Sequence, residues 1–457
     1  MKTKNKNLIF WLIGMLSFVF FNCKDDAIHY HQWEEWAVIN APTCEETGYG
    51  TRICSLCGME DDNRTIPALG HNWDSWTIIN PIIYSLTSVE VKRTCPHAHT
   101  ETFIGTFKEC LSKLTGSTAD EPFTFVINTN ELQDNALNNI YSYVNLDFSG
   151  STFTSMDSNA FSYSRGLVSI NLPSSVTGNL SSFYTCENLT SISVNINNPT
   201  YSSVDGVLYN KDKTTLIEYP HGKKDDTFII PDSVTRIGAY SFGNIRNLTS
   251  IAIPDSVTNV DSAFQNTNLM SISVNTNNPA FSSVDGVLYN KDKTRLIRYP
   301  PRKKNNNFTI PNSVIEIWDH AFSSCRNLTS VTMLNSVTEI YSFAFSDCSS
   351  LISVTIPNSV TYISQGVFYN CSFSSIHIPS SVYYIGYNAF RCYNLTSVNF
   401  AGTISSTHYY FGDAFPGLDA ESFPGDLCDK FYAIDKTNGT PGTYTRPNGN
   451  SNTWTKQ

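Results

Sequence analysis

Four residues near the start of the chain are of the types that bind zinc in proteins. Cys54 and Cys57 are separated by two residues, Cys44 precedes them, and His71 follows. Thiolate and imidazole are the ligands that structural zinc prefers, so this set predicts a tetrahedral site of three cysteines and one histidine. A disulfide from Cys44 to Cys54 or Cys57 would stabilise a small exported module equally well. The sequence leaves both alternatives open, together with unbonded thiols.

These residues belong to the first of two related modules in residues 29–102. Each module opens with the pattern H-x-W-x-x-W, at Trp33 and Trp36 and again at Trp73 and Trp76. We expect the tryptophans to form the small core of each module, because aromatic side chains supply most of the apolar area that such a module can bury. The second module lacks two of the cysteines, and its own potential metal ligands are a poorer set: Cys95, His97 and His99.

The first 22 residues have the layout of a secretory signal. Three lysines precede an apolar run at residues 8–21, which is too short and too abruptly ended for a membrane span. The run ends in Phe-Phe-Asn before Cys23, and this ending resembles a bacterial lipobox. The resemblance implies a lipid on Cys23, a tether over residues 23–28, and an exported lipoprotein held at the outer membrane or cell surface through that lipid. Simple secretion, with Cys23 unmodified, is the alternative.

Composition and motifs disfavour several classes of function. The formal net charge is −10, the sequence pI is about 5.4, and no basic stripe is present, so a nucleic-acid partner is not expected. The chain has no G-x-S-x-G, H-E-x-x-H or Gly-rich phosphate motif, which predicts a protein that is not an enzyme. Asp319 and His320 are expected to be exposed turn residues beside a buried Cys325. The basic residues 302–304 are expected to form a solvated loop.

A period of 23 residues dominates the second half of the chain. Phe322, Phe345 and Phe368 recur at this interval, and a cysteine lies three residues after each of them: Cys325, Cys348 and Cys371. Such a period marks supersecondary units that bury their apolar faces against each other, so we predict a β-rich solenoid. The cysteines are expected to be packing residues, since side chains in register on neighbouring coils point the same way and not at each other.

One short strand is expected in each unit, at residues 144–150, 167–172, 189–194, 248–253, 269–274, 328–333, 351–356, 374–378 and 395–400. Parallel pairing of these strands would build a single long sheet. Alternation sends Val331 and Met333 inward and their neighbours outward. The outward residues are small and polar, which favours contact with a protein or glycan over catalysis, although they could simply solvate the sheet. On four successive strands they are Ser330, Thr332, Ser353, Thr355, Ser375, His377, Ser397 and Asn399.

The repeated unit resembles the BspA-like leucine-rich repeats of bacterial surface proteins, whose unit is close to AFxxCxxLTSxTIPxSVTxIG. The resemblance covers roughly residues 146–415 and includes two long units, at residues 195–220 and 275–300, whose matching positions lie 80 residues apart. Each long unit is expected to contain a hairpin-like pair of strands turned at Asn-Lys-Asp-Lys. The modules in residues 29–102 resemble small repeats that precede such arrays in surface proteins of spirochaetes and clostridia.

The predicted organisation follows from these segments. It comprises a signal peptide at residues 1–22, a lipid-anchored tether at 23–28, two Trp/Cys modules at 29–102, an N-terminal cap at 103–143, repeats at 144–415, and a C-terminal cap and tail at 416–457. Within the first cap, residues 119–127 are expected to form a strand and residues 131–141 a short helix. The family resemblance implies adhesion to host or neighbouring cells, including their matrix proteins. A structural envelope protein and a glycan-binding module are the alternatives.

Overall fold

The computed structural model describes residues 32–40, 42, 47–55, 60–69, 71, 73–83, 85–94, 100–132, 135, 137–157, 159–178, 180, 183, 185–406, 408–410, 413–415 and 421–457. The predicted signal peptide, tether and Cys23 lie outside these residues, as do Cys44 and Cys57 and the second candidate ligand set of Cys95, His97 and His99. The chain divides into two compact units. One comprises residues up to Thr77 with Val91–Phe103, and the other comprises Ile78–Glu90 with Ile104–Gln457.

Two small three-stranded sheets form the Trp/Cys modules. The first contains β1 (Ala37–Asn40), β2 (Gly48–Ile53) and β3 (Glu60–Ile66), in which neighbouring strands pair antiparallel. The second contains β4 (Thr77–Ile78), β6 (Val89–Thr94) and β7 (Thr100–Gly105). Each sheet follows one of the tryptophan pairs in the sequence.

The solenoid begins with a helix and a short parallel ladder. Helix α1 (Phe107–Lys113) starts at a capping box of Thr106 and Glu109. Strand β8 (Phe123–Ile127) pairs in parallel with β5 (Ile82–Ile83) and with β9 (Val144–Asp147), so a strand is confirmed inside residues 119–127. The predicted helix at 131–141 is wrong, because the described residues there form turns. Asn135 and Asn139 adopt left-handed backbone conformations, and asparagine favours such turns over helix.

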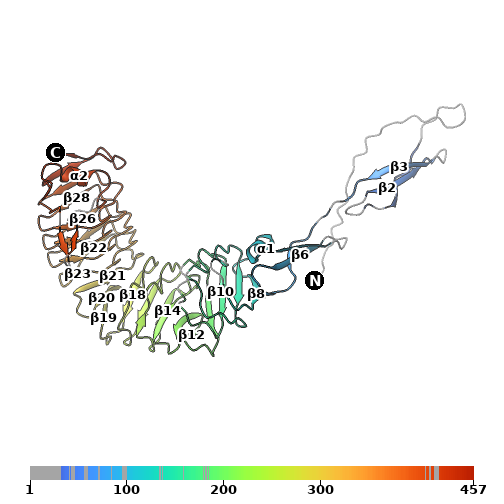
Figure 1. Cartoon of the computed structure of the whole chain (residues 1–457), viewed down its shortest axis with the longest axis horizontal. Coiled ribbons are helices and arrows are strands. Elements are labelled where there is room, and N and C mark those ends of the chain that lie inside the picture. Colours follow the sequence, from blue (N-terminus) through green and yellow to red (C-terminus); the bar gives the residue numbers. More distant parts are fainter. Residues whose placement is uncertain are drawn as a thin grey trace. The chain divides into compact units, whose positions relative to one another are not determined.

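A ladder of parallel strands runs along one side of the solenoid and is called here the long-strand ladder (Figure 1). The predicted single sheet is wrong, because this ladder is divided into four separately hydrogen-bonded sheets. Two of the breaks follow β11 and β18, where the backbone N–H groups of Ile192 and Ile272 donate instead to Gly206 and Gly286 of the long units. The strands are β9, β10 (Leu167–Leu172) and β11 (Ser191–Val194); β15 (Thr227–Ile229), β17 (Ser250–Ile253) and β18 (Ser271–Val274); β22 (Asn307–Thr309), β24 (Ser330–Thr332) and β26 (Ser353–Thr355); and β28 (Ser375–Ile378) and β30 (Ser397–Phe400).

Each long unit is a three-stranded antiparallel meander. The first contains β12 (Tyr201–Val204), β13 (Val207–Asn210) and β14 (Thr215–Glu218), and the second contains β19 (Phe281–Val284), β20 (Val287–Asn290) and β21 (Arg295–Arg298). The predicted pair is present, and an additional strand precedes it. The two-residue turns Asp205-Gly206 and Asp285-Gly286 have positive φ at both positions, which is the conformation that tight hairpins require.

A second ladder of two-residue strands runs along another side of the same coils and is called here the short-strand ladder. In the C-terminal half it continues from β21 through β23 (Glu316–Ile317), β25 (Glu339–Ile340), β27 (Tyr362–Ile363) and β29 (Tyr384–Ile385), all parallel. In the N-terminal half β16 (Arg236–Ile237) pairs with β14. In the sequence these strands lie at the end of the repeated pattern Ser-Val-x-x-Ile, and two residues are too few to show the period of a strand.

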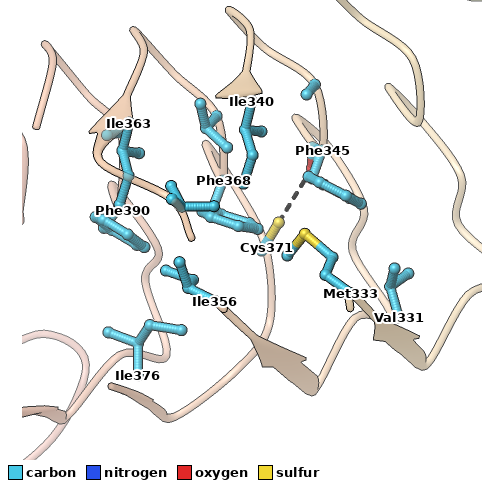
Figure 2. Packing of buried hydrophobic residues seen from close by; sticks show 14 of the residues in the cluster. Val331, Met333, Ile340, Phe345, Ile356, Ile363, Phe368, Cys371, Ile376 and Phe390 are labelled. Atoms are coloured by element: carbon cyan, nitrogen blue, oxygen red, sulfur yellow. Dashed lines mark hydrogen bonds between the residues drawn. The ribbon is translucent and has the colours of Figure 1, made fainter. Parts of the chain in front are cut away.

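The core lies between the two ladders. Figure 2 shows Val331, Met333, Ile356 and Ile376 from the long-strand ladder and Ile340 and Ile363 from the short-strand ladder, with phenylalanine rings between them. The rings of Phe322, Phe345 and Phe368 stack at centroid distances of 4.7 Å and 5.3 Å. The 23-residue period therefore places one aromatic ring above another in successive coils.

The cysteines of the repeat are buried thiols. Each Sγ donates to the carbonyl oxygen of the aromatic residue one coil earlier: Cys325 to Tyr299 at 3.7 Å, Cys348 to Phe322 at 3.1 Å, and Cys371 to Phe345 at 3.1 Å, the last of which is drawn in Figure 2. Cys392 makes the same bond at 2.9 Å. The packing interpretation is confirmed, and the hydrogen bond adds a reason for cysteine over alanine at this position.

The C-terminal segment closes the long-strand ladder. Strand β33 (Gly442–Thr445) pairs antiparallel with β30, and β34 (Thr455–Lys456) pairs with β33. Helix α2 (Leu427–Phe431) and the buried Trp454 lie in the same segment. A two-stranded sheet of β31 (His408–Tyr410) and β32 (Asp413–Phe415) precedes it. Neither α1 nor α2, the two helices within the described residues, has the length and hydrophobicity that a bilayer crossing needs.

Candidate binding surfaces

The eight outward residues predicted on the long-strand ladder form what is called here the polar face. Strands β24 and β26 pair so that Ser330 lies beside Ser353 and Thr332 beside Thr355. Val331 is 3% exposed whereas Thr332 is exposed, so the predicted alternation is confirmed on β24. The structure therefore places four small hydroxyl groups on two adjacent strands, with the apolar side chains of β24 turned to the core.

The other four residues lie on the next sheet. Ser375 pairs with Ser397, and His377 with Asn399. The imidazole Nδ1 of His377 lies 2.7 Å from Oδ1 of Asn399, and since an amide oxygen only accepts, Nδ1 donates. The Asn399 amide then donates to the hydroxyl of Thr443 at 2.9 Å. Because β26 and β28 belong to different sheets, the polar face consists of two four-residue blocks and not one continuous ladder.

The polar face carries little charge, and three of its side chains, Ser330, His377 and Asn399, form hydrogen bonds to neighbouring strands. Ser330 donates to the Asn307 side chain of the preceding strand at 2.8 Å. The same arrangement recurs at the other end of the ladder, where Asn171 donates to Asp147 at 2.9 Å. Side chains that are already paired across coils hold a fixed orientation, so these three residues of the polar face are preorganised for contact with a rigid partner.

In the modules, each tryptophan pair holds an arginine. The guanidinium carbon of Arg93 lies 4.8 Å from the ring centroids of both Trp73 and Trp76, and Arg93 forms an ion pair with Glu101 at 2.5 Å. Arg52 lies between the tryptophans of the first module in the same way, at 4.6 Å and 4.7 Å. The tryptophans of each module thus contact an arginine that the sequence analysis did not identify. All four are half-buried and not part of a fully buried core, so their role as the core of each module stays a prediction.

Two of the four predicted zinc ligands lie within the described residues. Cys54 is 1% exposed, and its backbone forms an isolated bridge with Trp33. The His71 imidazole stacks on Trp73 with ring centroids 4.3 Å apart. The described part of the chain contains no group of three or more potential metal ligands. Zinc and a disulfide both remain predictions, since Cys44 and Cys57 lie outside that part.

The short-strand ladder carries aromatic and acidic side chains that were not identified from the sequence. Arg295 pairs with Glu316 and lies 4.5 Å from the ring centroid of Trp318. The Tyr362 and Tyr384 rings stack at 4.4 Å. In the sequence, aromatic and acidic residues recur directly before the Ile of the Val-x-x-Ile pattern, and this recurrence could have identified them. These side chains already contact each other across coils, which indicates a structural role.

The Asp319–His320 pair is half-buried, so its predicted exposure is wrong. Desolvation and the neighbouring Arg298 lower the pKa of His320 to about 4, while burial raises the pKa of Asp319. Arg298 is itself buried and donates to the backbone carbonyls of His320 and Ser323. Here Arg298 satisfies turn carbonyls and the neutral His320 ring stacks on a phenylalanine, so the geometry indicates packing and not acid–base catalysis.

Comparison with protein-family models finds six copies of the BspA type leucine rich repeat region, over residues 104–220, 221–290 and 302–414. No curated protein matches the chain. The solved structures that resemble it include the pneumococcal vaccine antigen PcpA, at 19% identity and a TM-score of 0.42, covering 75% of this chain and 87% of that one. A leucine rich cell surface protein of Faecalibacterium prausnitzii matches at 23% identity and a TM-score of 0.37, covering 75% and 84%. A leucine-rich repeat protein of Eubacterium ventriosum matches at 21% identity and a TM-score of 0.35, covering 67% and 93%.

Proposed function

The chain belongs to the BspA-type leucine-rich-repeat family, and from that premise we propose that it is a non-enzymatic protein of the cell surface that binds a protein partner through its polar face. The observation that carries the proposal is the register of this face. Small polar side chains occupy the same outward positions on successive strands, and several of them are oriented by hydrogen bonds between coils. An extended, repeated surface of this kind suits adhesion better than catalysis.

Exposed apolar side chains beside the ladder favour a protein over a glycan as the partner. Ile352, directly before β26, is 66% exposed, and Met270, directly before β18, is 42% exposed. Ile229 on β15 is 76% exposed. Protein interfaces combine such apolar anchors with a polar surround, whereas these side chains offer no hydrogen bond to a sugar.

The proposed location at the cell surface is based on the first residues of the sequence. The apolar run at residues 8–21 and Cys23 support export and attachment by a lipid, which would hold the solenoid outside the cell. Protein ligands of the extracellular matrix are the partners that the family resemblance suggests, and they are the first to test.

A binding assay on immobilised matrix proteins tests the proposal. We expect the whole mature chain to bind at least one of them saturably, and the double substitution Thr332→Arg with Thr355→Arg to weaken binding at least about tenfold, because two bulky charges on adjacent strands block the face. Thr361→Arg is the matched control, since Thr361 is also exposed but precedes a strand of the short-strand ladder. Absence of saturable binding would leave a structural envelope role, and equal binding by the double variant would exclude the polar face.

A further inference from the structure

A cavity of about 480 Å³ lies among the turns that precede the long strands of the middle coils, and every residue that lines it is polar or charged. Three of these residues are arginines, Arg246, Arg302 and Arg326, and one is an acid, Asp347. The cavity therefore has an excess of two positive formal charges in a chain whose net charge is −10. The basic residues 302–304 were expected to be a solvated loop, but Arg302 belongs to this cavity.

Hydrogen bonds hold the arginine-bearing turns in place. The backbone N–H of Arg302 donates to the carbonyl of Leu269 at 2.9 Å, and its Nε donates to Oδ1 of Asn268 at 3.0 Å. The amide of Asn268 in turn donates to the backbone carbonyl of Arg246 at 2.8 Å. Asn268 thus links two of the three arginines. Within the described residues, the terminal guanidinium nitrogens of Arg302 make no hydrogen bond or ion pair.

The rim of the cavity is shaped by the repeated turn itself. Asn266, Ser324 and Asp347 each adopt a positive φ, between 52° and 62°, at the equivalent turn of three different coils. The Ser324 hydroxyl donates to Oδ1 of Asn266 at 3.2 Å, which joins two of these turns. Asparagine and aspartate tolerate this conformation at little cost, so the rim is a stable feature of the fold.

The first long unit provides an internal comparison. Gly222, 80 residues before Arg302, makes the same backbone hydrogen bond, from its N–H to the carbonyl of Leu189 at 2.7 Å. A Cβ at Gly222 would lie 2.4 Å from the backbone carbonyl carbon of Asn188, so no side chain fits there without a shift. Gly166 stands 80 residues before Arg246. The repeat therefore folds without these two arginines, and their convergence in the second half is not required by packing.

We propose that this cavity binds the sulfate groups of a sulfated polysaccharide. Planar guanidinium groups donate two parallel hydrogen bonds to an anionic oxygen pair, which makes arginine well suited to sulfate. The surrounding asparagine amides and hydroxyls match sugar hydroxyls, and an acidic peptide is disfavoured because no apolar or aromatic side chain lines the cavity. Arg246 also contacts Glu187 at 3.5 Å, with its side chain 69% exposed, and such a pair is weak enough for a sulfate to replace. The site is separate from the polar face and does not depend on the proposed protein partner.

Titration calorimetry on the whole mature chain, with heparin and dextran sulfate as probes, tests this inference. We expect saturable binding that weakens as salt rises, and no binding of uncharged dextran. Arg302→Gly, which introduces the residue of the first long unit, and Arg326→Ala should each weaken binding about fivefold or more. Arg302→Lys should lose part of the affinity, since it keeps the charge but not the guanidinium fork. Lys436→Ala, an exposed lysine of the C-terminal segment, is the matched control.

Three results would overturn the inference. The first is the absence of saturable binding to both sulfated probes by the wild-type chain. The second is equal binding by Arg302→Gly and Arg326→Ala when their melting temperatures match the wild type. The third is equally tight binding of poly-glutamate, which would show that the site takes any polyanion and would contradict a sugar ligand. Loss of binding in both arginine variants, with retention in Lys436→Ala, supports it.

Discussion

The side-chain amide of Asn278 satisfies four backbone groups inside the second long unit. Its Nδ2 donates to the carbonyls of Pro254 and Val257 at 2.6 Å and 2.9 Å. Its Oδ1 accepts from the N–H groups of Ala280 and Phe281 at 2.9 Å and 2.7 Å. Asn198 makes the equivalent four bonds in the first long unit. A buried polar side chain with every hydrogen bond made can bridge two coils without the desolvation cost that an unpaired group would incur.

Substitution Asn278→Ala should lower the free energy of unfolding by about 2–4 kcal/mol, because it leaves buried backbone donors and acceptors unpaired. Urea unfolding followed by circular dichroism measures this change. Asn277→Ala, at the exposed neighbouring position, is the control and should change stability by less than about 0.5 kcal/mol. A loss below about 1 kcal/mol for Asn278→Ala would show that water satisfies the exposed groups instead.

The asparagine of the repeated Asn-Leu-Thr triplet has a similar role at the turn. Asn188, Asn247 and Asn327 each donate from Nδ2 to a backbone carbonyl of the preceding coil, at 2.6 Å to 3.1 Å. Asn268, which is followed by Leu-Met and not by Leu-Thr, does the same at 2.8 Å. The triplet also matches a glycosylation signal, but it is part of the repeat, so the match carries almost no information about glycosylation. The bond between coils is the physical reason for the asparagine.

At the scale of the element, the second Trp/Cys module depends on one arginine. Arg93 on β6 lies between Trp73 and Trp76 and also pairs with Glu101 on β7, so it joins both tryptophans to the sheet. The module buries little apolar area, and for such a small sheet a few contacts decide whether it is folded.

We therefore expect Arg93→Ala to destabilise the second module by about 1–2 kcal/mol, through the loss of two cation–π contacts and an ion pair. Hydrogen exchange of the whole chain, resolved by peptide, should show faster exchange in residues 73–94 and 100–105 and little change beyond residue 144. Lys92→Ala, on the same strand but exposed, is the control. Unchanged protection in Arg93→Ala would mean that the tryptophans pack without the arginine.

The long units show how an element can change the ladder that it interrupts. Their Asp-Gly turns accept the hydrogen bonds that β11 and β18 would otherwise give to a next parallel strand. The solenoid continues past them because β14 and β21 join the short-strand ladder instead. Strand pairing therefore continues after each long unit in the short-strand ladder, although the long-strand ladder is broken there.

At the scale of the whole molecule, a solenoid of repeated coils is stable only if its ends are covered. At the C-terminal end β33 pairs antiparallel with β30, and Arg446 is buried with its Nε donating to the carbonyl of Leu395 at 2.5 Å. Trp454 is buried beside this arginine, with its ring centroid 5.1 Å from the guanidinium carbon. The end of the chain is thus part of the fold and satisfies the last edge strand.

Removal of residues 441–457 should expose the edge of β30 and cause self-association. Sedimentation velocity of the truncated chain is expected to show oligomers or aggregates at concentrations where the full chain is monodisperse. Lys456→Ala, an exposed substitution in β34, is the control for an altered C-terminus. A truncated chain that stays monodisperse, with the melting temperature of the full chain, would show that the edge of β30 does not need residues 441–457 to prevent self-association.

Some features of this protein could be predicted from the sequence because they repeat at short range. The 23-residue interval of Phe322 and Phe345 predicted the stacked coils, and the alternation around Val331 predicted the inward and outward sides of its strand. Both are determined by local periods of the chain. The helix predicted at residues 131–141 failed, since weak local propensity yields to turn-forming asparagines in a tertiary setting.

Other features were decided only by the tertiary structure. Arg246, Arg302 and Arg326 are separated by as many as 80 residues and share a cavity because coils stack. The short-strand ladder consists of two-residue strands that only pairing across coils can define, and the burial of Asp319 and His320 depends on neighbouring coils. A sequence period determines that equivalent residues of adjacent coils become neighbours, as Phe322 and Phe345 do. The contacts between residues of different kinds depend on which turns the stacked coils bring together, and that stacking exists only in the folded chain.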